Sequence, residues 1–322
     1  MKILIQTGMT LPEVTEDELK EIYIASAEGE VIVVNSNEAA QEHLPDTEVM
    51  MGIVDQKSFP KAKNLKWLHS TAAGADMLMY PEMVRSKVVI TGEKGLVGDH
   101  LSDHAFGLLL MLTRQLRRAT EEIPNSWPSR PIMRKVMFEL SGSTAGIVGF
   151  GGTGVVMARK ARAFGMKVFA VDSEKRDKTE DLSDDVWGID RFHEMLARSD
   201  VVFICCPLTR ETRGMFNDTA FDAMKPTALL VNVTRGPIVD LDAITKALRE
   251  GKIAGAGLDV TPIEPLPADN PLWMMPNVMI TPHTAGASQF RAGRNVRRFI
   301  TNLRHYRANE PLEGEIDKQK GF

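Results

Sequence analysis

The stretch "GIVGFGGTG", residues 146–154, decides the fold of this chain. Its glycines Gly149, Gly151 and Gly154 stand in the G-x-G-x-x-G order, which at the turn between a strand and a helix holds the pyrophosphate of a dinucleotide. The backbone N–H groups that open such a helix, and the positive end of its dipole, attract phosphate oxygens. We therefore predict a dinucleotide site at this turn.

The stretch lies near the middle of a chain of 322 residues, a length that suits two domains. Runs rich in Val and Ile alternate with helical patterns on both sides of it, which is typical of parallel sheets covered on both faces. Before the stretch we predict strands at 3–7, 31–34, 49–55, 67–70 and 88–91. From the stretch onward we predict strands at 144–150, 167–172, 201–206, 228–234, 253–259 and 278–282. The fold class is therefore α/β, with two doubly wound domains.

Two long helical patterns, at 101–119 and 288–307, flank the second set of strands. The later one can carry the chain back to the first domain. We therefore predict that a dinucleotide-binding domain at 99–287 is inserted into a discontinuous domain made of 1–98 and 288–322. The Pro-rich and charged stretch at 121–142 is predicted to be an extended connection or arm.

Composition restricts the classes of partner. The net charge of -4 gives no broad basic field, which argues against nucleic acid. We find no apolar stretch suited to a signal peptide or a membrane span, and we expect a cytoplasmic protein. Cys205 and Cys206 are adjacent, so they should not pair with each other, and no Cys/His spacing suggests zinc or another metal site. We expect both thiols to lie in the core.

The strand after the glycines indicates which cofactor is bound. It ends at Asp172, near the offset at which a carboxylate binds the ribose 2′-hydroxyl. A negative charge there repels a 2′-phosphate, so the sequence favours NAD over NADP. Lys175 and Arg176 are close enough to weaken that preference.

Three charged or titratable residues follow strands of the second set. Arg235 comes just after one strand, Glu264 lies in a Pro-rich loop after another, and His283 ends the last. Ligands of open α/β sheets bind outside the carboxyl ends of the strands, so the three side chains can converge there. A guanidinium binds a carboxylate or carbonyl oxygen, an imidazole transfers a proton, and a carboxylate beside the imidazole favours its charged form.

Successive motifs carry a resemblance to a known family. They read "GIVGFGGTG", "CCPLTRETRGMFN", "MKPTALLVNVTRGPIVD", "GAGLDVTPIEPLPADNPLW" and "ITPHTAGAS". In this order, between about residue 65 and residue 300, the chain resembles the D-isomer-specific 2-hydroxyacid dehydrogenases. The resemblance implies a Rossmann NAD-binding domain inserted into a flavodoxin-like substrate domain. It also implies hydride transfer between NAD(H) and a small 2-oxo or 2-hydroxy acid.

The resemblance also assigns roles. Arg235 would bind and polarise the substrate, His283 would be the acid/base, and Glu264 would be its partner. Formate dehydrogenases of the family carry Gln at the position of Glu264, so a glutamate here favours oxo-acid chemistry. The substrate carboxylate would be held by Ala73, Gly74 and Ala75 in "STAAGAD", together with Arg235. Cofactor contacts are implied for Gly149, Gly151, Gly152, Thr153, Gly154, Asp172, Pro207, Thr212, Val233, Thr234, Asp259 and His283.

Several alternatives remain at this level. Transcriptional corepressors that recognise partner peptides use the same fold, so an NAD-sensing binding protein is a second hypothesis. The substrate side chain is not readable, and glyoxylate, hydroxypyruvate and larger 2-oxo acids all fit. Candidate pocket residues are Met9, Met51, Gly52, Lys94 and Leu96. We expect a homodimer through the arm, in which Trp127, Pro128 and Met133 either form the interface or pack within the chain.

A basic helical pattern near the end of the chain offers a further choice. It contains Arg291, Arg294, Arg297, Arg298, Arg304 and Arg307. Such a row could bind an acidic partner, but blocks of charge along a helix are usually solvated, and we interpret these arginines as a solvated face.

Overall fold

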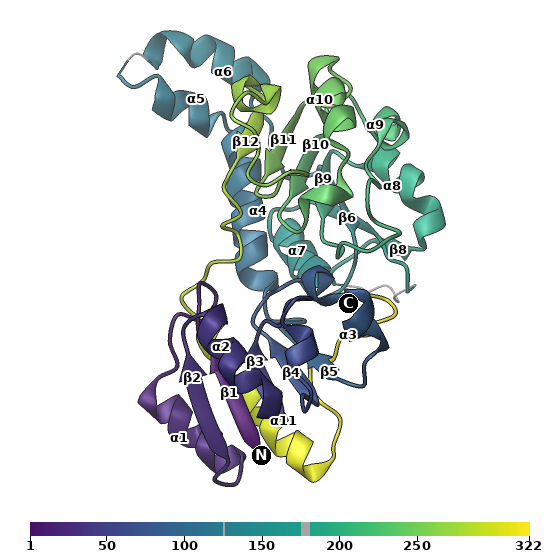
Figure 1. Cartoon of the computed structure of the whole chain (residues 1–322). Helices are drawn as coiled ribbons and strands as arrows, with labels where there is room; N and C mark the ends of the chain where they lie inside the picture. The colour runs from purple at the N-terminus through teal and green to yellow at the C-terminus, as the bar shows by residue number, and fades with distance from the viewer. Residues whose placement is uncertain (125, 175–180) are drawn as a thin grey trace. The chain divides into compact units, whose positions relative to one another are not determined.

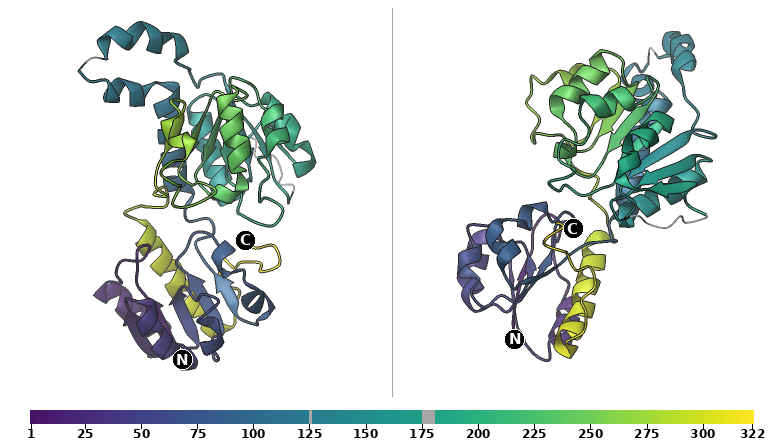
Figure 2. Two further views of the ribbon diagram at one scale, coloured as in Figure 1. Left: turned by 45° about the horizontal axis from the view of Figure 1, so that its top comes forward. Right: turned by 90° about the vertical axis from the view of Figure 1, so that its right-hand side faces the viewer.

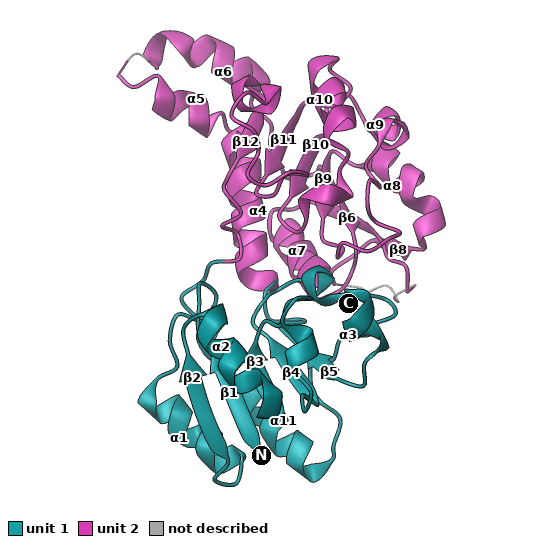
Figure 3. Ribbon diagram, in the orientation of Figure 1, with its two compact units in different colours: residues 1–97, 287–322 teal, residues 98–286 magenta. Residues whose placement is uncertain are grey.

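The computed structural model describes residues 1–124, 126–174 and 181–322. The chain forms two compact units (Figure 3). Unit 1 consists of Met1–Val97 and Ala287–Phe322, and unit 2 of Gly98–Gly286. The chain therefore leaves unit 1 once and returns to it for its last segment.

Unit 1 is built on a five-stranded parallel sheet (Figure 1). Its strands are β1 (Lys2–Gln6), β2 (Glu30–Val34), β3 (Val49–Gly52), β4 (Trp67–Ser70) and β5 (Val89–Thr91). They lie in the order β2-β1-β3-β4-β5, which is the flavodoxin-like order. The predicted fold of this unit is confirmed, and the carboxyl ends of all five strands lie at one edge of the sheet.

Helices cover both faces of this sheet (Figure 2). They are α1 (Glu16–Ala25), α2 (Asn37–His43), α3 (Pro81–Arg85) and α11 (Arg291–Ala308). Alternate residues of β1 point to opposite faces: Ile3 and Ile5 pack with α1 and α11, whereas Leu4 packs with α2 and α3. The returning helix α11 is thus part of the core of unit 1.

Unit 2 is built on a seven-stranded parallel sheet. Its strands are β6 (Thr144–Val148), β7 (Lys167–Val171), β8 (Asp185–Trp187), β9 (Val201–Ile204), β10 (Leu229–Asn232), β11 (Gly255–Leu258) and β12 (Val278–Ile280). The order β12-β11-β10-β9-β6-β7-β8 places β6 and β9 next to each other where the direction of winding reverses. Ligands of doubly wound sheets bind at this switch point, and the glycine stretch follows β6 directly.

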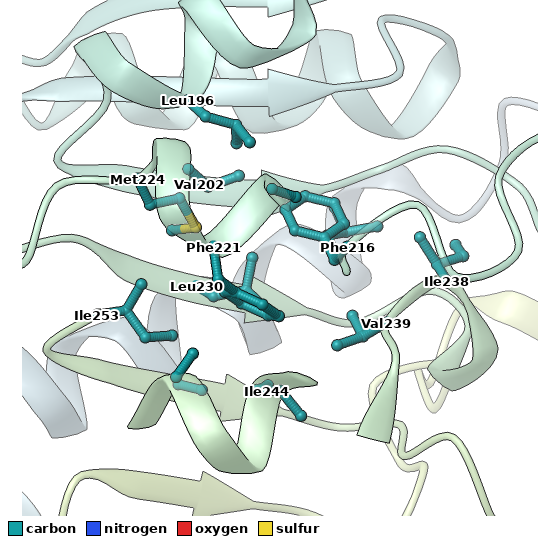
Figure 4. Packing of buried hydrophobic residues seen from close by; sticks show 14 of the residues in the cluster. Leu196, Val202, Phe216, Phe221, Met224, Leu230, Ile238, Val239, Ile244 and Ile253 are labelled. Carbon is teal, nitrogen blue, oxygen red and sulfur yellow. The ribbon is translucent and has the colours of Figure 1, made fainter. Parts of the chain in front are cut away.

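The helices of unit 2 also lie on both faces. They are α4 (Gly98–Thr113), α5 (Leu116–Glu121), α6 (Arg130–Val136), α7 (Gly152–Ala163), α8 (Phe192–Arg198), α9 (Asp218–Ala223) and α10 (Leu241–Arg249). Phe203 of β9 points to the face of α4, where its ring lies 5.3 Å from that of Phe106. The neighbouring residue Val202 points to the opposite face and packs with Leu196, Phe221 and Ile244 of α8, α9 and α10 (Figure 4). This core fixes the strand ends that carry the candidate site.

Three local features differ from the predictions. β8 was not predicted, because it is a three-residue edge strand whose apolar content is one Val and one Trp. The helix predicted over 101–119 is broken at Gln115, which adopts a left-handed conformation with φ 54°. The stretch at 121–142, predicted as an extended connection or arm, does project from the rest of unit 2 together with α5, but it contains the helix α6 and is not extended throughout (Figure 1).

The arginines of α11 were interpreted as a solvated face, and the structure differs from this. Four of the six arginines donate hydrogen bonds within unit 1, so for them a purely solvated role is wrong. These are Arg291, Arg294, Arg298 and Arg307. Their partners are mainly backbone carbonyls, which no charge pattern along a helix identifies.

The prediction for the two cysteines is confirmed, because both thiols are free and buried. Among the residues that the structure describes, none of the helices combines the length and the apolar character that a bilayer crossing requires.

Candidate active site

The glycine stretch forms a close turn between β6 and α7. Gly149 has φ +91°, and a Cβ there would lie 2.7 Å from the backbone of Cys206. A Cβ on Gly154 would lie 2.0 Å from the carbonyl oxygen of Gly149. Gly151 is the N-cap of α7, and a Cβ on it would have nothing within 4 Å. Gly149 and Gly154 therefore permit the close turn. Gly151 leaves the outer side of the turn open, at the point where Gly152 and Thr153 begin α7.

Asp172 is tied to this turn. One oxygen of its carboxylate accepts the backbone N–H of Phe150 at 2.7 Å, and the other accepts that of Glu174 at 2.9 Å. The carboxylate thus lies beside the glycines at the end of β7, which is where the ribose of a dinucleotide would be bound. Lys175 and Arg176 lie outside the described residues.

The loop after β9 is closed by Thr212. Its hydroxyl donates to the carbonyl of Pro207 at 2.7 Å and accepts the N–H of Thr209 at 2.8 Å. This loop follows the strand next to β6, so it lies at the same edge of the sheet as the glycines.

Arg235 follows β10, in a half-buried position. Asn232 organises this loop: its amide donates to the carbonyl of Arg235 at 2.9 Å, and its side-chain oxygen accepts the N–H of Thr234 at 3.1 Å. Val233 is buried beneath them. A Cβ on the next residue, Gly236, would lie 1.8 Å from the carbonyl oxygen of Thr261. The arginine loop is therefore in close contact with the loop that carries Glu264.

Glu264 and His283 form a direct pair. The Nδ1 atom of His283 lies 2.7 Å from one carboxylate oxygen of Glu264, and the other oxygen accepts the N–H of Thr261 at 3.0 Å. The imidazole is half exposed, with 47% of its side chain accessible. With its Nδ1–H directed to the carboxylate, the ring presents Nε2 as the atom that can exchange a proton.

The backbone of His283 is held in an uncommon conformation. Its φ is 53°, in the left-handed region that residues other than Gly and Asn seldom adopt. The N–H of His283 donates to the carbonyl of Asp259 at 2.8 Å, which helps to fix the turn. Such outliers cluster at functional sites, where the surrounding structure imposes them.

Asp259 is the buried centre behind this turn. Its carboxylate is 1% exposed and accepts the hydroxyl of Thr281 at 2.7 Å and the N–H groups of Thr284 and Ala285 at 2.9 and 2.8 Å. The Nε2 atom of His104, on α4, lies 2.8 Å from the Thr281 hydroxyl and 3.3 Å from Asp259. His104 and Thr281 were not predicted as site residues; both contact Asp259, which joins them only in the folded chain.

These contacts determine the charge of Asp259. Burial raises the pKa of this carboxyl, but the hydrogen bonds from His104, Thr281 and the two backbone amides outweigh burial, so its pKa lies below the ordinary value of 3.8. Asp259 is therefore ionised at neutral pH and braces the turn that presents His283.

We expect Asp259→Asn to lower the melting temperature at pH 7 by roughly 3–10 °C, because charge-assisted hydrogen bonds are lost. A carboxyl with a lowered pKa stabilises the fold fully above its ordinary value of 3.8, and this stabilisation disappears as the pH falls through the folded-state pKa. The difference between variant and wild type should therefore shrink below about pH 4. Calorimetry between pH 3 and pH 7, with exposed Asp269→Asn as the control, measures it; a difference independent of pH would contradict the argument.

The predicted carboxylate loop belongs to unit 1, where it follows β4. Its first turn is held by the N–H of Ala72, which donates to the hydroxyl of Ser70 at 3.1 Å, and its end by the N–H of Leu78, which donates to the carbonyl of Ala75 at 2.8 Å. Within the part of the chain that the structure describes, the N–H groups of Ala73, Gly74 and Ala75 have no protein acceptor. Consecutive free N–H groups of this kind bind anions.

The candidate pocket residues separate into two groups. Met51 is fully buried in β3, on the face that packs against α1 and α11, so the suggestion that it lines a pocket is wrong. Gly52 ends the same strand, and its place in a pocket stays a prediction. Met9 and Lys94 are exposed and Leu96 is partly so. Strand pattern alone does not identify which face each residue takes.

Comparisons with known proteins identify the family of this chain. Residues 106–285 match the model of the D-isomer-specific 2-hydroxyacid dehydrogenase NAD-binding domain. The chain is 36% identical to the glyoxylate reductase of Thermofilum pendens over 237 residues, which cover 73% of this chain and 70% of that protein.

Solved structures extend the likeness to both units. A D-isomer-specific 2-hydroxyacid dehydrogenase family protein of Aeromonas salmonicida is similar with a TM-score of 0.79 and 30% identity, covering 98% of this chain and 99% of the other. The NADPH-dependent glyoxylate/hydroxypyruvate reductase of Sinorhizobium meliloti, solved with NADP and sulfate, has a TM-score of 0.79 and 25% identity, with 100% of each chain covered. The chain belongs to the D-isomer-specific 2-hydroxyacid dehydrogenase family and is an NAD(P)-dependent oxidoreductase.

Proposed function

We propose that this protein reduces a small 2-oxo acid to the D-2-hydroxy acid, reversibly and with NADH as the hydride donor. The observation that carries the proposal is the bond between His283 and Glu264, at the carboxyl edge of the same sheet whose glycine turn suits a dinucleotide. A glyoxylate reductase among the relatives supports this substrate class.

The glycine turn fits the cofactor, because added Cβ atoms would collide inside it but not on its outer side. The N–H groups at the start of α7 would hold the pyrophosphate, and Asp172 the ribose. When bound, the reduced nicotinamide supplies a hydride to the carbonyl carbon of the substrate.

The side chains of the chain do the rest of the chemistry. Arg235 binds the substrate and polarises its carbonyl through paired N–H donors. Protonated His283 gives a proton to the carbonyl oxygen, and Glu264 keeps the imidazole oriented. The free N–H groups at 73–75 bind the substrate carboxylate. In the reverse direction, neutral His283 accepts the proton of the hydroxyl group.

The choice of NAD over NADP rests on Asp172. Its carboxylate would bind the 2′-hydroxyl of NAD and repel the 2′-phosphate of NADP. The relative from Sinorhizobium meliloti was solved with NADP, so NADP occurs among similar proteins. The carboxylate beside the glycine turn supports NAD for this chain.

The proposal is tested by following absorbance at 340 nm with NADH and, separately, NADPH against 2-oxo acids from glyoxylate and hydroxypyruvate to phenylpyruvate. We expect turnover with NADH and a lower kcat/KM with NADPH. The panel also ranks the possible substrate side chains. Tight NADH binding without turnover of any acid would contradict the proposal and favour an NAD-sensing binding protein of the same fold.

We expect Glu264→Gln to lower kcat for 2-oxo acid reduction on the order of 10-fold or more. A carboxylate only accepts hydrogen bonds, so it holds Nδ1–H of His283 toward itself and leaves Nε2 for the substrate. An amide can also donate to the ring and so admits the other tautomer. The measurement is kcat at pH 7, with the exposed Glu250→Gln as control. A kcat equal to that of the wild type would remove Glu264 from this role.

We also propose a homodimer formed through α5 and α6. Trp127 and Ile132 of this projection are 74% and 54% exposed, whereas Met133 is buried. Exposed apolar residues gathered on a projecting pair of helices support an interface with a second copy. A cytoplasmic location is proposed as well, supported by the two free cysteines.

A further inference from the structure

A buried ion pair joins α11 to the loop after β5 in unit 1. Glu93 is 2% exposed, and its two carboxylate oxygens lie 2.9 and 3.0 Å from Nε of Arg291. A second guanidinium nitrogen, Nη2, lies 2.5 Å from one of them. The amide of Asn295, one turn along α11, donates to Glu93 at 3.1 Å. Both oxygens of the carboxylate are therefore engaged by one face of one helix.

A directed chain of hydrogen bonds fixes Asn295 in turn. Its side-chain oxygen lies 2.6 Å from Nε2 of His69, and Nδ1 of His69 lies 2.7 Å from the hydroxyl of Thr91. That hydroxyl accepts the indole N–H of Trp67 at 2.8 Å. Burial lowers the pKa of His69 to about 4, so the ring is neutral and carries one proton. With this proton on Nε2, every donor in the chain meets an acceptor.

This arrangement is costly, which suggests that it has a purpose other than stability. Burial raises the pKa of Glu93 in spite of the adjacent Arg291, because removing a carboxylate from water is unfavourable. Buried ion pairs are often less stabilising than apolar side chains of the same volume. What such a pair does provide is a single fixed geometry.

The guanidinium of Arg291 also contacts the first residue of the loop that is predicted to bind the substrate carboxylate. Its Nη2 also lies 3.5 Å from the carbonyl oxygen of Thr71, at the long end of the hydrogen-bond range. Farther along the same face of α11, Arg294 donates to the carbonyl of Leu96 at 3.3 Å, and Arg298 to those of Gly92 and Lys94 at 3.1 and 2.6 Å. The helix thus fastens both loops that follow β4 and β5.

We propose that Arg291, held by Glu93, is a positioning residue that sets the shape of the loop at 71–75 for binding the substrate carboxylate. This inference rests on the proposed function. The three free N–H groups follow Thr71 by two to four residues, so the orientation of its carbonyl determines where they point. A displacement of about 1 Å in a binding group can cost on the order of 100-fold. The rigid fork of an arginine bonded to a carboxylate restricts such a displacement, whereas the flexible ammonium of a lysine does not.

The test compares Arg291→Lys with Arg307→Lys. Both arginines lie on α11 and donate to a backbone carbonyl, but the carbonyl that Arg307 reaches is that of Ala25, in α1. For Arg291→Lys we expect KM for glyoxylate, or for the best 2-oxo acid of the panel, to rise on the order of 10–100-fold, with kcat changed less than about threefold. Binding of oxamate to the NADH-bound protein, measured by calorimetry, should weaken by a similar factor. The Kd of NADH should stay within about twofold for both variants.

A second variant separates positioning from stability. The double variant Glu93→Leu/Arg291→Met removes both charges together, so no unpaired charge is left in the core and the unit should remain folded. It should show the same rise in KM while it still unfolds in one cooperative thermal transition, although the amide of Asn295 loses its acceptor. A KM within twofold of the wild-type value in either Arg291 variant would overturn the inference, as would equal effects of Arg291→Lys and Arg307→Lys. Absence of turnover in the wild type would instead contradict the proposed function itself.

Discussion

His283→Ala should lower kcat for 2-oxo acid reduction on the order of 10²–10⁴-fold, the usual contribution of a positioned acid/base. The reduction needs a proton at the carbonyl oxygen as the hydride arrives, and the imidazole bonded to Glu264 at 2.7 Å is the group of this site that can supply it near neutral pH. In the proposed mechanism the ring acts on the carbonyl oxygen of the substrate and not on the pyrophosphate, so the affinity for NADH should change little. Steady-state kinetics together with NADH titration by fluorescence measure both quantities.

His193→Ala serves as the control, because this histidine is exposed and lies on α8, after the edge strand β8, whereas His283 follows β12 at the other end of the sheet. It should retain wild-type kcat and KM. If His283→Ala turned over within a factor of about ten of the wild type, His283 would not be the acid/base. If His283→Ala also bound NADH more weakly or melted at a lower temperature, the lower kcat would be explained by a disturbed left-handed turn at residue 283 and not by the loss of a proton donor.

The sequence predicted the two sheets because buried parallel strands have a distinct composition. β9 is continuously apolar and buried along its length, so its amino-acid composition was enough to predict a strand. β8 was not, because a short edge strand buries little and carries few apolar residues. The break at Gln115 was also missed, since a left-handed residue other than Gly or Asn leaves no signal in the sequence.

The candidate site divides in a similar way. Arg235, Glu264 and His283 could be named in advance because charged or titratable residues after strand ends are visible in the sequence. The contacts that hold them were not, because they join distant segments: His104 on α4 lies 2.8 Å from Thr281, at the other end of unit 2's sequence. The pair of Glu93 with Arg291 joins residues that are 198 positions apart. Such contacts depend on the fold as a whole, so periodicity and motif spacing do not reveal them.

Gly151→Ala should weaken NADH binding by at least about tenfold while leaving the melting temperature unchanged. In the glycine fingerprint the second glycine allows the backbone to approach the pyrophosphate. A Cβ at Gly151 meets no atom of the described residues within 4 Å, and its φ of -80° is open to any residue, so the folded chain accepts alanine. The added methyl group would lie on the open side of the turn, where the phosphates must come close to the N–H groups of α7.

Gly154→Ala and Gly107→Ala complete the test, with NADH titration and thermal unfolding as the measurements. A Cβ at Gly154 would lie 2.0 Å from the oxygen of Gly149, so this variant should lose both stability and NADH affinity. Gly107, in α4, has free space around its Cβ position and should lose neither. Only a phosphate group beside the turn makes Gly151 behave differently from Gly107, since the protein itself tolerates both changes. Wild-type NADH affinity in Gly151→Ala would therefore show that the turn is built for chain packing and that the pyrophosphate is bound elsewhere.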